Sequence, residues 1–153
     1  MDLTASRADR RRRSLGVAAL TVTAHALLVV LALDRADGAV LLEPGGSSYA
    51  TEFIDTGFWN AAWLLVPLAG VAAALWVWSG VLAVVLTTIA HTVAATITIQ
   101  RYDAGGWSDG LEVLSYLWPI GHVLLGGGAV LAGTVIGRAH RRAQPAPGAA
   151  GRR

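Results

Sequence analysis

The stretch that decides the fold is residues 58–99, FWNAAWLLVPLAGVAAALWVWSGVLAVVLTTIAHTVAATITI, which contains no Asp, Glu, Lys or Arg. As one helix it would be about 63 Å long, twice the roughly 30 Å thickness of the hydrocarbon core of a bilayer. The stretch therefore predicts two membrane-spanning helices, at about residues 58–78 and 81–99. Ser79-Gly80, near its centre, is the expected turn between them.

Two more apolar segments flank this hairpin. Residues 14–33 contain His25 as their only ionisable group and are long enough to cross a membrane. A cleaved signal peptide is the alternative for this segment, because arginines precede it and Ala36-Asp37-Gly38 resembles a cleavage site. The fourth span is expected at residues 111–137. The sequence thus predicts an all-α, integral membrane four-helix bundle in which the first and fourth helices close the bundle through faces of small residues.

Charge is distributed unevenly along the chain. All 12 basic residues are arginine, and most lie near the two ends, whereas carboxylates dominate residues 34–112. Arginine beside a span is retained on the cytoplasmic side, so both ends should be cytoplasmic and the number of crossings even. Residues 1–13 and 138–153 are then cytoplasmic basic tails, the second one disordered, and residues 34–57 and 100–110 are external loops. The arginine- and alanine-rich composition is typical of a bacterial chain, and we expect a location in the bacterial cell membrane.

Several kinds of chemistry are excluded by composition and motif. The chain has no cysteine, which excludes disulfides, thiolate metal sites and thiol catalysis. It also has no Gly-x-Ser-x-Gly element, and Gly126-Gly127-Gly128 lacks the lysine of a phosphate-binding loop. The basic pI of about 9.7 comes from the tails and does not indicate nucleic-acid binding. No complete catalytic constellation is visible, so the sequence predicts a protein that is not an enzyme.

Three histidines are the candidate functional residues, because polar groups inside a membrane are expensive. His25, His91 and His122 each lie about 17 Å from one end of their expected span, which predicts a shared depth near the midplane on three different helices. Each shares a helical stripe with small or polar residues. These stripes contain Ser14, Ala18 and Thr21 on the first helix, Thr87, Thr88, Ala95 and Thr98 on the third, and Gly126, Ala129, Gly133 and Gly137 on the fourth. If the stripes face one another, the three imidazoles meet in the interior.

Four roles for these histidines remain open from sequence. Two rings on facing helices are suited to hold haem b, and three are suited to bind a metal ion. The rings are also suited to pass protons. A fourth role is structural, since a neutral histidine bonded to a threonine or to a backbone carbonyl joins membrane helices in the ordinary way.

Other polar and aromatic positions in the spans have simpler explanations. Pro67 frees a backbone carbonyl and predicts a kink, and Asn60 lies near the external end of the same helix. The aromatic residues expected at the two membrane surfaces are Trp59, Trp63 and Tyr116 outside and Trp76 and Trp78 inside.

These observations predict a small multi-pass membrane protein acting as an accessory or scaffold subunit without a cofactor. Its partners would be the lipid bilayer and either another membrane protein or a second copy of itself. The alternative function is a haem- or metal-binding, or proton-conducting, membrane protein that uses the three histidines.

Overall fold

The computed structural model describes residues 7–35, 54–104 and 116–143, and the regular elements in these ranges are helices. They are α1 (Arg7–Asp34), α3 (Thr56–Leu65), α4 (Leu68–Leu75), α5 (Val77–Ala104) and α6 (Leu117–Arg142). Four helices are long and apolar enough to cross a membrane, with α3 and α4 together forming the second. The predicted all-α class with four candidate spans is confirmed for the described ranges.

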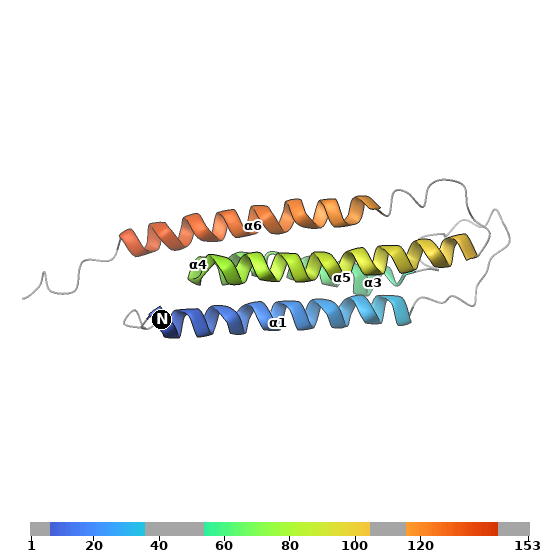
Figure 1. Ribbon diagram of the computed structural model, residues 1–153, viewed down its shortest axis with the longest axis horizontal. Coiled ribbons are helices and arrows are strands. Elements are labelled where there is room, and N and C mark those ends of the chain that lie inside the picture. The colour runs from blue at the N-terminus through green and yellow to red at the C-terminus, as the bar shows by residue number, and fades with distance from the viewer. Residues whose placement is uncertain (1–6, 36–53, 105–115, 144–153) are drawn as a thin grey trace, which may run out of the picture.

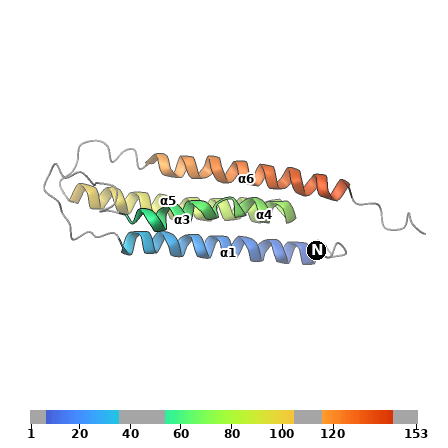
Figure 2. The same ribbon diagram turned by 180° about the vertical axis from the view of Figure 1, so that it is seen from behind.

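The helices run alongside one another, with α1 and α6 on opposite sides of the α3–α4 and α5 layer (Figure 1, and Figure 2 from behind). The start of α1, the connection from α4 to α5 and the end of α6 lie at one end of the bundle, here called the tail end. The end of α1, the start of α3, the end of α5 and the start of α6 lie at the other, here called the loop end. The two arginine-bearing termini therefore share one end, as an even number of crossings requires.

Polarity in this bundle is inverted relative to a water-soluble protein. Large aliphatic side chains face outward, with Leu64 at 79% exposure and Leu124 at 71%. The buried polar side chains are Ser14, Thr21, His25, Ser79, Thr87, His91, Thr98 and His122. Because water would not favour this distribution, an apolar surround of lipid explains it best.

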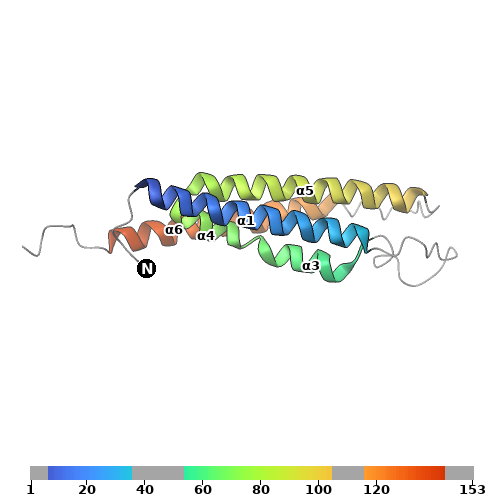
Figure 3. The ribbon, with the colours of Figure 1, turned by 90° about the horizontal axis from the view of Figure 1, so that it is seen from below.

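The second span is broken in two, as Figure 3 shows from below. Asp55 caps α3 by accepting a hydrogen bond from the Phe58 amide at 3.0 Å, and its own amide donates to the Ala32 carbonyl of α1 at 2.8 Å. At Pro67 the backbone has no N–H to continue the helical ladder, and the chain passes through a tighter turn before α4 begins. The kink predicted at Pro67 is present.

The predicted turn at Ser79-Gly80 is wrong by about one helical turn. The chain reverses at Trp76, whose extended backbone (φ −154°, ψ 113°) ends α4, and Ser79 and Gly80 already lie in α5. The Ser79 hydroxyl donates to the Trp76 carbonyl at 2.7 Å, so the serine closes the turn from within the helix. The Ser14 hydroxyl of α1 contacts that hydroxyl and donates to the Ala72 carbonyl at 2.7 Å.

The face of α6 lined by small residues packs against α4, not against α1 as predicted. A methyl group on Gly133 would lie 1.9 Å from the Gly70 carbonyl oxygen, and one on Gly137 would lie 2.3 Å from the Ala74 carbonyl oxygen. The helix pairs with extensive contact are α4 with α6, α1 with α5, α5 with α6, α1 with α3, α1 with α4 and α4 with α5. A stripe of small residues predicts close approach but does not identify the helix that approaches.

The helices extend beyond the predicted spans at several ends. α1 begins at Arg7, inside the expected basic tail, and its first turns carry an ion pair between Asp9 and Arg13 at 2.9 Å. α6 continues to Arg142, so residues 138–142 of the expected disordered tail are helical. α5 reaches Ala104, inside the expected external loop. Residues 36–53, 105–115 and 144–153, with the remaining parts of both loops and the second tail, lie outside the described residues.

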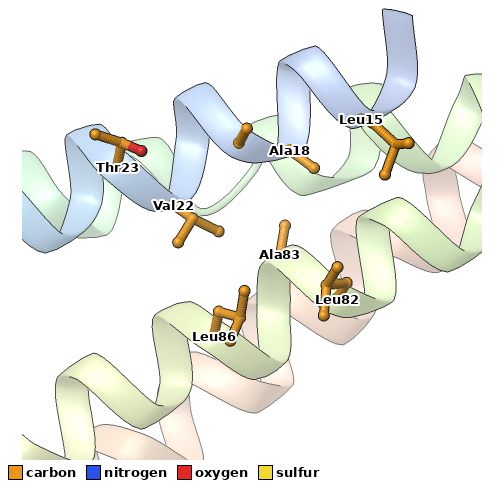
Figure 4. A pocket seen from close by; sticks show the side chains of 8 residues that line it. Leu15, Ala18, Val22, Thr23, Leu82, Ala83 and Leu86 are labelled. Carbon is orange, nitrogen blue, oxygen red and sulfur yellow. The ribbon is translucent and has the colours of Figure 1, made fainter. Parts of the chain in front are cut away.

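Basic side chains contact the α4–α5 connection at the tail end. The Arg11 guanidinium lies over the Trp76 ring at 4.6 Å from its centroid. Arg141 donates to the Ala74 carbonyl at 3.0 Å. On the outer surface nearby, α1 and α5 form a shallow apolar groove lined by Leu15, Ala18, Ala19, Val22, Thr23, Leu82, Ala83 and Leu86 (Figure 4). Such a surface is ordinary where lipid chains pack against helices.

The close contact between α4 and α6 gives the first prediction. Gly133→Ala should lower stability by about 1–3 kcal/mol, because the methyl group forces two backbones apart. Thermal unfolding in detergent measures this effect. Gly127→Ala is the matched control on the same helix, since a methyl group there meets nothing within 4 Å. Equal melting temperatures for the two variants would contradict the packing described here.

Candidate functional site: a buried cluster of three histidines

The three predicted histidines come together inside the bundle. His25 of α1, His91 of α5 and His122 of α6 are each 0% exposed. Their ring centroids are 4.7 Å apart for His25 and His91, 5.2 Å for His25 and His122, and 4.4 Å for His91 and His122. We call this group the histidine cluster. It joins α1 to α6, which are not among the pairs in extensive contact.

The sequence stripes explain why the rings converge. Ser14, Ala18, Thr21, His25, Val29 and Ala32 are the buried residues of α1, spaced by three or four. On α6 the buried residues His122, Gly126, Gly133 and Gly137 are spaced by four or seven, which also keeps them on one face. Because residues at this spacing share one helical face, each histidine is turned inward with the small residues that let the helices approach.

Hydrogen bonds fix the tautomers of two rings. His25 Nδ1 lies 3.0 Å from the Ala62 carbonyl oxygen, which only accepts, so Nδ1 carries the proton. In the neutral ring, His25 Nε2 is then an acceptor, and it lies 2.8 Å from His91 Nδ1. His91 Nδ1 must therefore be the donor of this bond. It follows that the Nε2 atom of a neutral His91 holds an unprotonated lone pair.

Two ring nitrogens of the cluster are left without a partner. His91 Nε2 and His122 Nε2 are buried and make no hydrogen bond within the described part of the chain. His122 Nδ1 lies 3.0 Å from the Thr88 hydroxyl, which either donates to it or accepts from it. Buried polar atoms are satisfied in the great majority of cases, so two orphans in one cluster require an explanation.

Two indole rings from α3 cover the cluster, a contact that their expected role as surface anchors did not predict. The Trp59 ring lies 4.4 Å from that of His91 by centroid, and Trp59 is only 6% exposed. The Trp63 ring lies 5.1 Å from His91 and 5.5 Å from His122. Trp118 of α6 packs on Trp59 at 4.8 Å. Trp59 is therefore an interior residue, and the partly buried Trp63 and Trp118 extend the cover over the histidines.

Sequence reasoning missed these aromatic neighbours, although a signal was present. Trp59, Ala62, Trp63 and Val66 are spaced by three and four and therefore share one face of α3, and Ala62 supplies the carbonyl that His25 binds. Because these tryptophans lie near the end of a span, we expected them at the membrane surface and did not consider the helical face that they share. Asn60, in contrast, is exposed and outside the cluster.

The histidines lie at different distances from the ends of their helices. By helical rise, His25 is about 18 Å from Arg13 and about 14 Å from Asp34. His122 is about 24 Å from Arg138 and about 8 Å from Leu117. The cluster therefore lies toward the loop end of α1 and α6, and its depth in a membrane stays a prediction.

The nitrogen atoms have the spacing of a potential metal site. One ligand nitrogen from each histidine lies within 4.8 Å of the others, and within the described ranges no carboxylate belongs to the group. In a tetrahedral zinc site with Zn–N bonds of about 2.0–2.1 Å, nitrogens are about 3.4 Å apart, so the rings would have to move closer, and His91, whose Nδ1 faces His25, would have to turn. The Ala62 carbonyl and the Thr88 hydroxyl hold the opposite ring nitrogens of His25 and His122, as outer partners of metal ligands typically do.

A haem is a poorer fit to this packing. Two axial histidines must lie on opposite sides of a porphyrin plane. The rings of His91 and His122 instead contact each other at 4.4 Å, and Trp59 and Trp63 pack directly on them. The arrangement therefore suits a single ion better than a macrocycle.

The fold and cluster define the class of this protein as an all-helical chain with four candidate membrane spans around a buried group of imidazoles. No protein family, curated protein or solved structure matches the chain.

The hydrogen bonds of His25 give the second prediction. His25→Leu removes the partner of both the Ala62 carbonyl and His91 Nδ1, and should lower stability by about 1–2 kcal/mol. Thermal unfolding in detergent measures the loss. Thr92→Val is the control, because the exposed Thr92 hydroxyl bonds only to the Thr88 carbonyl of its own helix. A His25→Leu variant as stable as the control would show that these bonds contribute nothing.

Proposed function

We propose that this chain is a membrane protein that binds one transition-metal ion between α1, α5 and α6. The observation that carries the proposal is the pair of buried, unpartnered nitrogens, His91 Nε2 and His122 Nε2, beside a third imidazole whose tautomer is fixed. A metal ion would satisfy both nitrogens when His122 donates from Nδ1 to Thr88, which leaves its Nε2 free of a proton, as that of His91 is. Imidazole is a suitable neutral ligand for zinc, copper, iron and nickel.

The outer contacts support a ligand role for the Nε2 atoms. Donation from His25 Nδ1 to the Ala62 carbonyl leaves His25 Nε2 free of a proton, which a metal ligand requires. Donation from His122 Nδ1 to the Thr88 hydroxyl would prepare His122 in the same way. His91 Nε2 is already unprotonated, but His91 Nδ1 is the atom that faces His25 Nε2, at 2.8 Å. On binding, the His91 ring would have to turn so that Nε2 faces the ion, and His25 Nε2 would exchange its bond with His91 for the ion.

A non-enzymatic accessory or scaffold subunit is the second candidate function. It is favoured by the backbone contacts between α4 and α6 and by the bonds through which His25 links α1, α3 and α5. In this role the histidines only join helices, and recognition of another membrane protein or a second copy would occur on the outer surface. This candidate leaves the two unpartnered nitrogens unexplained, which is why we place it second.

The proposed location is the bacterial cell membrane, with both termini in the cytoplasm. Arginines near both described termini support this orientation, because Arg11 and Arg141 reach the same end of the bundle. The loop end, with the nearby histidine cluster, then faces outward. Membrane orientation then explains the basic residues. Neither nucleic-acid binding nor a catalysed reaction has to be assumed for them.

Metal content gives the third prediction. The full chain, purified with an affinity tag that contains no histidine, should bind close to one metal ion per chain by elemental analysis after incubation with zinc or copper salts. His91→Ala and His122→Ala should each lose the ion, because each removes a ligand. His140→Ala is the matched control, since His140 is exposed in the last turn of α6, away from the cluster.

Three outcomes would contradict this proposal. Metal content that is equal in the wild type and in folded His91→Ala protein would place the ion elsewhere. A metal-free wild type would favour the scaffold role. A Soret band in the visible spectrum that disappears in His122→Ala would instead support haem.

Orientation gives the fourth prediction, and the absence of native cysteine makes the test simple. Single cysteines at Ser47 and Ser108 should react with a membrane-impermeant thiol reagent added to intact cells, whereas one at Ser6 should react only after lysis. The proposed orientation places the first two positions outside and the third inside. Labelling of Ser6→Cys in intact cells, or protection of Ser108→Cys, would overturn it.

A further inference from the structure

We infer that the ion held by His25, His91 and His122 is monovalent copper, Cu(I), in preference to a divalent ion. This inference rests on the proposed metal-binding function and specifies its ligand. It is drawn from the charge of the donor set, its number of donors and its burial.

The donor set is electrically neutral. Three imidazoles supply the nitrogens, no carboxylate from the described residues joins them, and the chain has no cysteine to supply a thiolate. A bound ion would therefore keep its full charge inside the bundle. The charged groups that flank α1 lie about 14 to 18 Å away along its axis, too far to neutralise the ion directly.

Burial makes that charge expensive. All three rings are 0% exposed, and apart from the Thr88 hydroxyl beside His122 the side chains described around them are alkyl groups and indoles. The cost of moving an ion from water into a medium of low dielectric constant grows with the square of its charge, so it is on the order of four times larger for a divalent ion than for a monovalent ion of similar size. Neutral ligands in a dry site thus discriminate by charge, in favour of the monovalent ion.

The number and type of donors lead to the same ion. Zinc held by three protein ligands takes a water or substrate as its fourth ligand, whereas the described cluster offers three nitrogens on rings that are 0% exposed. Cu(I) has a filled d shell and forms stable complexes with three donors in a plane. Sodium and potassium have the right charge but prefer oxygen donors, which the cluster does not direct inward. The electron-rich face of an indole also attracts cations, and Trp63 packs against both His91 and His122.

The experiment compares Cu(I), Cu(II) and Zn(II) on the same purified chain in detergent. Cu(I) is titrated without oxygen, in the presence of ascorbate and a competing chromophoric chelator, and the other two ions are titrated with chelators of their own. We expect one Cu(I) per chain with an affinity at least about 100-fold higher than that for Cu(II) or Zn(II). We also expect three nitrogen neighbours in the X-ray absorption spectrum.

A charge variant tests the cause of this preference. Thr88→Asp puts a carboxylate beside His122 Nδ1 and should shift the affinity ratio toward Zn(II) by at least about tenfold. Thr88→Asn is the neutral control, because asparagine has the same shape as aspartate. It should leave the ratio of the Cu(I) affinity to the Zn(II) affinity nearly unchanged. His140→Ala should bind Cu(I) as the wild type does, and folded His91→Ala should not.

Each other outcome overturns the inference in a recognisable way. Zn(II) or Cu(II) bound at the histidines as tightly as Cu(I) refutes the choice of ion and leaves the proposed function standing. Binding of none of the three ions refutes both. Equal affinity ratios for Thr88→Asp and Thr88→Asn refute the electrostatic cause.

Discussion

A polar side chain inside a lipid-facing bundle has to find its partners within the bundle, because the hydrocarbon offers none. The buried serines and threonines of this protein meet that demand mainly through backbone carbonyls. Thr87, for example, bonds to the Ala83 carbonyl of its own helix at 2.8 Å. An imidazole has two polar atoms on opposite sides of a rigid ring, and one helix cannot satisfy both. The three histidines therefore have to be served by several helices at once.

This demand is met only in part. His25 is satisfied on both sides, by a carbonyl of α3 and by a ring of α5, whereas His91 and His122 are each satisfied on one side. Leaving these two nitrogens without a hydrogen bond costs free energy. The bundle is otherwise closely packed, with the backbones of α4 and α6 in contact through Gly70 and Gly133.

Much of this arrangement could be predicted from the sequence, because hydropathy and charge determine spans without reference to partners. The stripe that ends in His25 on α1 correctly identified the buried face of that helix.

Neighbours on other helices could not be predicted in the same way. The pattern on α6 predicted a close contact, but α4, not α1, supplies it through Gly70. We expected Trp59 and Trp63 at the membrane surface because they lie as close to a charged loop as interfacial tryptophans do. The face of α3 that they share was not considered. The turn was expected at Ser79-Gly80 because a serine and a glycine favour turns, yet Ser79 closes the turn from inside α5.

The distribution of polar groups along the bundle separates two tasks. At the tail end, Ser14 and Ser79 tie α1 to the α4–α5 connection through hydroxyl and carbonyl groups, each of which has a partner. That network is sufficient to hold helices together and uses short side chains. Near the loop end the same task could be met by threonine or asparagine, with fewer unpaired atoms than three imidazoles leave. The cluster places three large rings in contact, covers them with two indoles and leaves two ring nitrogens without a partner among the described residues, and the proposed metal site rests on this excess over what helix association needs.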